Sequence, residues 1–301
     1  MPLLEQLPSG GRVLIVRLRS LGDCVLTTPA IQILHEHRPD LEIGVAVEPR
    51  FREVFTGNPA VRRILSPSLK EAAAFRSNLA INFHGGSRSM WLTLASLAGK
   101  RAGFAHYRHQ WIYNARIPRA QEILGAERKV HTAEHLASAM FWLGVPRREI
   151  PRASLFAEPE RADKPYAVLH ALASQTDKTW PADRFAKVAD ALIARGLEPV
   201  FICGPGEEIA SLARFRWVAG ASLEQVKSLL AGAALFIGND SGPAHMAAAF
   251  GIPVVVLFGS SDPVVWAPWK TAAEQIVGID GIRSVPVDQV IQAMDRLQVR
   301  A

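Results

Sequence analysis

The sequence predicts an α/β protein of two domains, each with a parallel sheet covered by helices. Short runs of aliphatic and β-branched residues alternate with helix-length segments, and strands joined in this way form parallel sheets through right-handed crossovers. The alternation stops at Pro151–Pro165, a proline-rich stretch without periodicity, and then restarts. We therefore expect domains at residues 1–155 and 156–301, with a ligand crevice between the carboxyl edges of two sheets.

In the first domain we expect strands at residues 11–18, 41–47 and 78–86. The first is an apolar, β-branched run, after which the pattern changes to helical spacing and stops before Pro39. The third strand ends in two glycines, and residues 89–99 then have the spacing of a helix. This order of elements is that of a βαβ sheet.

The second domain repeats the pattern. Strands are expected at 166–171, 197–204, 234–238 and 252–259. A helix at 180–196 has Pro181 in its first turn and Gly196 at its end, and a helix at 222–233 begins with Ser222 and Gln225 in capping-box spacing. The amphipathic segment 287–298 predicts a last helix, which either completes this domain or packs back on the first one.

Composition and termini indicate a well-packed cytoplasmic protein. Apolar residues make up 49% of the chain and charged residues 21%, which excludes a disordered chain. Apolar runs are all shorter than the roughly 18 residues of a membrane span, and the first residues lack the features of a signal peptide. Cys24 and Cys203 lie far apart in the sequence, so we expect neither a disulfide framework nor a metal site.

Positive charge is concentrated in the first half. Residues 1–150 contain 20 Lys and Arg against 12 Asp and Glu, whereas residues 151–301 contain 14 against 16. An anionic partner of the first half and a solvated, Arg-rich surface both fit this excess. The aromatic residues are not interleaved with the basic ones as in a base-stacking platform, so a nucleic-acid partner is not expected.

The stretch ALFIGNDSGPAHMAAAFGIPVVVLFG, residues 234–259, places polar residues between two apolar strands. Asp240 or Ser241 is a suitable N-cap for the helix that follows. The amides of Ser241 and Gly242 would then lie at a helix N-terminus, where phosphates bind, and His245 would face the same side. The alternative is a plain capped helix with His245 hydrogen-bonded in the core.

Two more loops of the second domain follow strands. Residues 171–181 contain Ser174, Thr176 and Lys178, and a lysine here could neutralise a diphosphate or could simply be solvated. In the loop at 203–208, Glu207 could accept hydrogen bonds from ribose hydroxyls, although a lone glycine-rich turn is a weak signal.

The loop after the first strand, residues 17–23, contains Asp23 near a predicted helix N-terminus. This carboxylate could act as a base or could cap the helix. The loop lacks the GxGxxG spacing of a dinucleotide site, so an oxidoreductase is poorly supported, even with Glu48 after the second strand.

Three segments in this order give the chain a family resemblance: VLIVRLRSLGDCVLTTPAI, LHALASQTDKTWPADRF and FIGNDSGPAHMAAAFGIPVVVLFG. With them, the chain resembles glycosyltransferase family 9, the heptosyltransferase family of lipopolysaccharide core assembly. The resemblance implies the GT-B architecture, in which two Rossmann-like domains face each other across a cleft.

The resemblance also implies a reaction. It is the inverting transfer of a heptose from ADP-heptose to an anionic, lipid-linked saccharide acceptor, without metal or cofactor, by a cytoplasmic enzyme that contacts the membrane surface. Two alternatives remain at this point: a GT-B enzyme that uses another nucleotide sugar, including an epimerase, and a non-catalytic anion-binding protein.

Residue roles follow from the matching motifs. Asp23 would be the general base and Lys178 would lie near the donor diphosphate. The remaining donor-binding residues would be Ser174, Thr176, Glu207, Asp240, Ser241, Gly242 and His245, with the WVAGAS segment at 217–222 facing the nucleotide base. Our expected acceptor-binding residues are Arg19, His84 and Arg88, with Arg62, Arg63, Arg101 and Arg108 as helpers.

Overall fold

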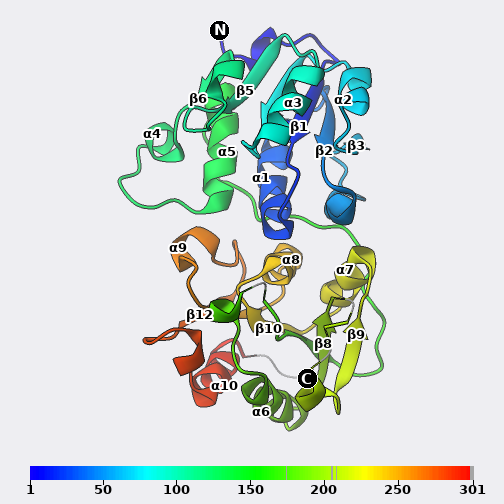
Figure 1. The fold of residues 1–301 in the computed structure, drawn as a ribbon, viewed down its shortest axis with the longest axis vertical. Coiled ribbons are helices and arrows are strands. Elements are labelled where there is room, and N and C mark those ends of the chain that lie inside the picture. Colours follow the sequence, from blue (N-terminus) through cyan, green and yellow to red (C-terminus); the bar gives the residue numbers. More distant parts are fainter. Residues whose placement is uncertain (174, 205, 208, 299–301) are drawn as a thin grey trace. The chain divides into compact units, whose positions relative to one another are not determined.

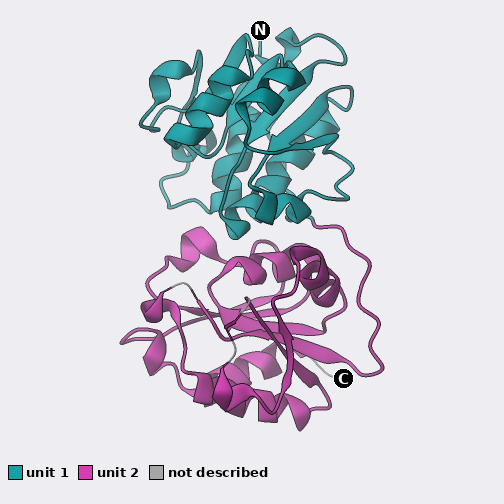
Figure 2. Ribbon diagram, turned by 45° about the vertical axis from the view of Figure 1, so that its right-hand side comes forward, with its two compact units in different colours: residues 1–154 teal, residues 155–301 magenta. Residues whose placement is uncertain are grey.

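The computed structural model describes residues 1–173, 175–204, 206–207 and 209–298. By its internal contacts the chain separates into two compact units, Met1–Ser154 and Leu155–Ala301 (Figure 2). The segment 151–165, predicted to interrupt the alternation, contains neither helix nor strand.

Unit 1 has a six-stranded parallel sheet in the order β3-β2-β1-β4-β5-β6 (Figure 1). This is the strand order of a Rossmann fold, in which the order of the parallel strands reverses between the first and fourth strands. The strands are β1 Arg12–Val16, β2 Glu42–Ala46, β3 Arg63–Leu65, β4 Leu79–Asn82, β5 Lys100–Phe104 and β6 Ala115–Ile117.

Helices cover this sheet in pairs. Helix α1 packs against α5, and α2 packs against α3. Apolar residues of β1, such as Leu14 and Val16, share a core cluster with Phe75 of α2 and Leu92 of α3. The helices are α1 Leu21–His37, α2 Leu69–Phe75, α3 Ser87–Ala95, α4 Ala120–Leu124 and α5 Thr132–Leu143, with 3-10 turns η1 Leu4–Gln6, η2 Pro49–Val54 and η3 Gln110–Ile112.

Unit 2 has a second six-stranded parallel sheet, in the order β12-β11-β10-β7-β8-β9. Counted from its own first strand, this is the same Rossmann order as in unit 1. The strands are β7 Tyr166–His170, β8 Glu198–Cys203, β9 Arg216–Ala219, β10 Leu235–Asn239, β11 Val254–Phe258 and β12 Ala273–Val277. Switch points therefore lie at β1/β4 and at β7/β10.

The helices of unit 2 enclose a core around Trp180, which is fully buried and contacts Phe185 edge to face. The last helix, α10, packs on α6 and on strands β11 and β12. The helices are α6 Ala182–Ile193, α7 Leu223–Ala231, α8 Gly242–Phe250, α9 Pro263–Trp266 and α10 Val287–Arg296, with turns η4 Thr176–Lys178, η5 Ala210–Leu212 and η6 Ile282–Ser284.

A local sequence signal explains the start of α7. The capping box of α7 is formed, because the Ser222 amide donates to Gln225 Oε1 at 2.9 Å and the Gln225 amide donates to Ser222 Oγ at 3.2 Å. Pro181 precedes α6 as its N-cap instead of lying in its first turn. Within the described ranges, no helix has the length and apolarity that crossing a bilayer requires.

The prediction for residues 217–222 is also wrong. Trp217–Ala219, expected in a loop facing the nucleotide base, belong to strand β9, where Trp217 is in register with Phe201. The segment was misread because an edge strand is only half-buried, so it lacks the long apolar run of the central strands. Several elements between residues 100 and 150 were also not predicted.

Candidate functional site

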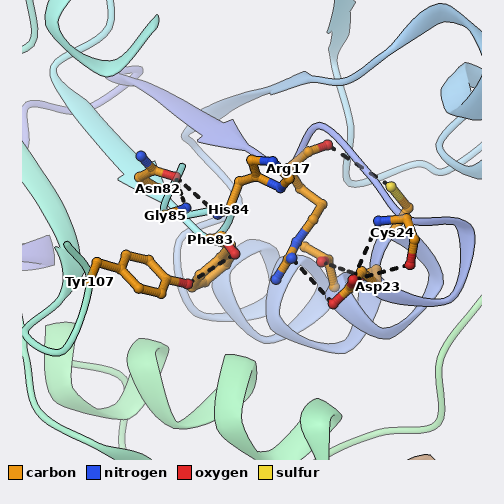
Figure 3. Close-up of polar contacts among 10 residues, drawn as sticks. Arg17, Asp23, Cys24, Asn82, Phe83, His84, Gly85 and Tyr107 are labelled. Carbon is orange, nitrogen blue, oxygen red and sulfur yellow. Dashed lines mark hydrogen bonds and ion pairs between the residues drawn. The ribbon is translucent and has the colours of Figure 1, made fainter. Parts of the chain in front are cut away.

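Polar side chains gather at the switch point of unit 1, where β1 and β4 end. Arg17 follows β1 and is only 6% exposed. Its Nη1 donates to Asp23 Oδ1 at 3.2 Å (Figure 3). The other carboxylate oxygen of Asp23 accepts bonds from the amide and the hydroxyl of Ser20, at 3.3 and 3.1 Å. Asp23 therefore lies at the N-terminus of α1, as predicted, but one of its oxygens is used in capping.

The loop after β4 is held by a buried amide. Asn82 accepts hydrogen bonds from the amides of His84 and Gly85 at 2.9 and 3.0 Å, and donates to Ser89 Oγ and to the Tyr113 hydroxyl. Gly85 has φ +78°, a conformation that favours glycine. These contacts fix His84 at the edge where Arg17 and Asp23 lie (Figure 3).

Neutral aromatic side chains border this edge. Tyr107 donates to the Phe83 carbonyl at 3.0 Å (Figure 3), and burial raises the pKa of Tyr107 to about 12. His135 of α5 stacks on Phe104 with ring centroids 4.0 Å apart, and burial lowers the pKa of His135 to about 4. Burial, and then the positive charges of Arg17 and Arg19, also lower the pKa of His84. All three groups are therefore uncharged at neutral pH.

The predicted acceptor-binding arginines do not all lie at this edge. Arg88, in the first turn of α3, is exposed and approaches Glu48 at 3.8 Å. Arg62 and Arg63 lie where β3 begins, and Arg63 forms an ion pair with Glu42 at 3.2 Å. Since the strands are parallel, Arg62 and Arg63 lie at the opposite edge of the sheet from Asp23.

Of the arginines predicted to help bind the acceptor, Arg101 has a structural role. It lies near the amino end of β5 and its guanidinium donates to the carbonyls of Ile112 and Ala98. Arg108 is exposed in the loop after β5, and Arg19 is exposed next to Ser20. Arg19 and Arg108 thus lie on loops of the carboxyl edge, as His84 does, and Arg88 lies at the start of α3 on the same edge.

In unit 2, the predicted polar stretch lies at the switch point between β7 and β10. The Asp240 amide donates to the Leu257 carbonyl at 2.9 Å, and Ser241 is the N-cap of α8, with Gly242 as its first residue. His245 is 4% exposed and its ring contacts Trp266 of α9, with centroids 6.2 Å apart. Asp240, Ser241, Gly242 and His245 are therefore brought together around the start of α8.

Sequence reasoning missed a partner of this stretch. His170, the last residue of β7, has its Nδ1 3.0 Å from Ser241 Oγ. Burial, opposed weakly by the charge of Glu207, lowers the pKa of His170 to about 4. A signal was available, because a histidine ends an otherwise apolar strand in YAVLH.

The loop after β7 crosses the ends of β10 and β11. Asn239 Oδ1 accepts from the Trp180 amide at 3.1 Å, and Asn239 Nδ2 donates to the Ala171 carbonyl at 3.0 Å. A Cβ added to Gly259 would overlap the Asp177 carbonyl, which shows that the turn η4 rests on the glycine. Lys178 is thereby placed at the same edge of the sheet as Ser241.

The remaining predicted donor residues that the structure describes, Thr176 and Glu207, are exposed and follow different strands of the sheet. Thr176 is exposed at the start of η4. Glu207 is exposed after β8, and its carboxylate accepts from the Gly204 amide at 2.8 Å. Ser174 lies outside the described residues. In the part of the chain that the structure describes, no three His, Cys, Asp or Glu side chains gather as metal ligands would.

Comparisons with known proteins identify relatives of this chain. The chain is 28% identical to lipopolysaccharide heptosyltransferase 3 of Escherichia coli K12, over 84% of this chain and 83% of that protein. Its fold resembles the glycosyltransferase family 9 protein of Veillonella parvula (TM-score 0.84, 21% identity, 95% of this chain and 97% of the other). It also resembles E. coli heptosyltransferase WaaC with ADP-2-deoxy-2-fluoro heptose (TM-score 0.79, 22% identity, 95% and 99%).

These structures confirm the predicted GT-B fold class. The pattern of Glycosyltransferase family 9 (heptosyltransferase) matches residues 68–284, which is well over half of the chain. The resemblance inferred from three sequence segments is therefore confirmed. The chain belongs to glycosyltransferase family 9 and is a glycosyltransferase.

Proposed function

We propose that this protein transfers a heptose from ADP-heptose to an anionic saccharide acceptor of the lipopolysaccharide core, with inversion at the anomeric carbon and without a metal ion. The observation that carries the proposal is the family match together with the polar loops at both switch points. One named relative is a lipopolysaccharide heptosyltransferase, and another is a heptosyltransferase solved with ADP-2-deoxy-2-fluoro heptose.

The donor would bind at the β7/β10 switch point of unit 2. The amide of Gly242 at the start of α8 and the hydroxyl of Ser241 suit a diphosphate. Lys178, at the same edge, would add a positive charge as ADP leaves. Asp240 would hold sugar hydroxyls, because a carboxylate facing a diphosphate is repelled. Lysine and helix terminus together could stabilise the leaving group in place of a divalent ion.

The acceptor would bind to unit 1, with Asp23 as general base. Asp23 would remove the proton from the attacking hydroxyl while that oxygen bonds to the anomeric carbon and the bond from this carbon to the diphosphate oxygen breaks. Arg17 supports this role, because its ion pair holds the carboxylate in place. His84, Arg88 and Arg19 would contact the anionic acceptor, whereas Arg62 and Arg63, at the opposite edge of the sheet, would not.

Contact with a membrane surface is a further part of the proposal. Unit 1 contains most of the excess positive charge, and two of its tryptophans, Trp91 and Trp111, are 58% and 66% exposed. Basic residues and exposed tryptophans both favour the interface of an anionic bilayer. Sedimentation with anionic but not with neutral vesicles would support this contact.

The test is sugar transfer from ADP-heptose to heptose-deficient core lipopolysaccharide, with and without EDTA. Asp23→Asn should reduce transfer by about a thousandfold, within the range of general-base catalysis, and should leave ADP affinity within a few-fold. Asp40→Asn is the matched control, since Asp40 is a carboxylate of unit 1 in an ion pair with Arg38. It should transfer at the wild-type rate.

A separate experimental outcome would contradict each part of the proposed reaction. Normal transfer by Asp23→Asn would remove the base assignment, and loss of transfer in EDTA would remove metal independence. A product that keeps the anomeric configuration of the donor would exclude inversion. Preference for UDP or GDP sugars would retain the transferase but reject heptose, and turnover without acceptor would indicate an epimerase-type reaction.

A further inference from the structure

The contact between His170 and Ser241 joins the two strands at the switch point of unit 2. His170 ends β7 and is in register with Gly238 of β10, three residues before Ser241. The histidine Nδ1 lies 3.0 Å from Ser241 Oγ. A side-chain bond at this position connects the end of β7 to the start of α8, and both belong to the proposed donor site.

The bond changes what Ser241 does at the helix. A serine at an N-cap usually accepts a hydrogen bond from an amide of the first helical turn. In α8, whose residues are all described, the Ser241 side chain makes no such bond. The second helical residue, Pro243, also has no N–H to offer. The hydroxyl is instead paired with the histidine.

The protonation of His170 limits what this pairing can be. Because burial lowers the pKa of His170 to about 4, the ring is neutral at neutral pH and has one nitrogen that donates and one that accepts. If Nδ1 carries the proton, it donates to Ser241 Oγ, and the serine proton is then available for an anionic oxygen. If Nδ1 accepts, the Ser241 hydroxyl donates its proton to the histidine and cannot donate to a ligand.

We infer that His170 is a positioning residue of the transfer reaction, which donates from Nδ1 to Ser241 Oγ and so directs the Ser241 proton toward the diphosphate of the donor. This inference rests on the proposed function, because it requires a nucleoside diphosphate at the start of α8. His170 acts only through Ser241 and is not itself in contact with the donor.

The inference is tested by a double-variant cycle, with ADP affinity measured by calorimetry. Ser241→Ala should weaken ADP binding about tenfold, the size expected of a hydrogen bond to a charged group. His170→Ala should weaken it by a similar factor, and the double variant should bind no worse than either single variant. His170→Asn should retain most of the affinity, because its amide can donate from nearly the position of Nδ1. His170→Asp, which can only accept there when ionised, should not.

Kinetics separate positioning from a merely structural role. Positioning predicts that His170→Ala raises the KM for the nucleotide sugar while the KM for the acceptor stays within twofold. If the histidine only supports the fold, both KM values and the melting temperature should change together, and His170→Asn should behave like His170→Ala. That result, or additive losses in the cycle, would overturn the inference.

Titration of the wild-type protein with ADP, UDP, GDP and inorganic pyrophosphate separates failure of the inference from failure of the proposed function. If another nucleoside diphosphate binds in place of ADP, the proposed donor is wrong, and the cycle is run with that ligand and still decides the role of His170. If none of the four binds, both proposals are overturned. If ADP binds but the losses are additive, only the role of His170 is rejected.

Discussion

Replacing Gly259 by alanine should displace the loop that contains Lys178. The added Cβ would overlap the Asp177 carbonyl and lie 2.9 Å from Lys178 Cα. Carbon atoms in ordinary contact are about 3.5–4.0 Å apart, so the turn η4 has to move by about 1 Å. Both atoms belong to backbone, which cannot yield by a rotamer change. The lysine must therefore move with the turn.

A displacement of this size is expected to slow sugar transfer by about a hundredfold, which is about 3 kcal/mol in activation free energy. The overpacking itself should cost about 1–3 kcal/mol of stability. Initial rates of transfer with saturating acceptor measure the effect. Gly99→Ala is the control, because nothing lies within 4 Å of its added Cβ.

The explanation through Lys178 has its own check. If Gly259→Ala acts by moving the lysine, it should cause little further loss in protein that already carries Lys178→Ala. Transfer at the wild-type rate by Gly259→Ala would refute the reasoning. So would a full hundredfold loss on top of Lys178→Ala.

Three further predictions concern unit 1. Because the pKa of His135 falls from 6.5 in the unfolded chain to about 4 in the fold, stability should drop by about 3 kcal/mol as the pH falls from 6.5 to 4. His135→Phe should lessen that drop in urea unfolding at the two pH values, and an unchanged drop would exclude this histidine as its source. Asn82→Asp should destabilise by about 3 kcal/mol, since an ionised carboxylate cannot donate to Ser89 and Tyr113; equal urea midpoints would contradict this. Gly85→Ala should lower the thermal midpoint by several degrees, because φ is +78° and the Cβ would lie 2.8 Å from the Tyr107 ring, and the Gly99→Ala control should not.

The sequence was sufficient for the central strands and the motifs, because both are marked by local patterns. An apolar β-branched run followed by small and polar residues identifies a strand and its loop, as at Asp23 and Ser241. Edge strands gave no such signal, and β9 was read as a loop because its residues are half-exposed. Burial differs between central and edge strands, and it depends on partners that a local pattern does not specify.

The site was predicted less completely than the fold, for a geometric reason. Arg62 and Arg63 were predicted from their charge alone. The charge of a residue does not indicate at which edge of the sheet the residue lies, and these two arginines lie at the amino edge. Arg17 and His170 were missed because Arg17 directly follows an apolar strand and His170 ends one, so neither stands out from the strand pattern. Their contacts with Asp23 and Ser241 are visible only when the strand ends are placed. Residues that act through a neighbour are therefore the ones that motif reading misses.

At the switch point of each sheet, a buried asparagine forms hydrogen bonds with the backbone of a loop. Asn82 ends β4 and Asn239 ends β10, which are equivalent strands in the two Rossmann orders. Each amide is fully buried, accepts from backbone N–H groups of a loop and donates from its nitrogen. A carboxylate could accept these bonds but could not donate, and its buried charge would need a partner. An uncharged amide therefore satisfies the backbone of both loops without adding a buried charge. The charged groups at the same sheet edges are Asp23, in the first turn of α1, and Lys178, in the turn η4.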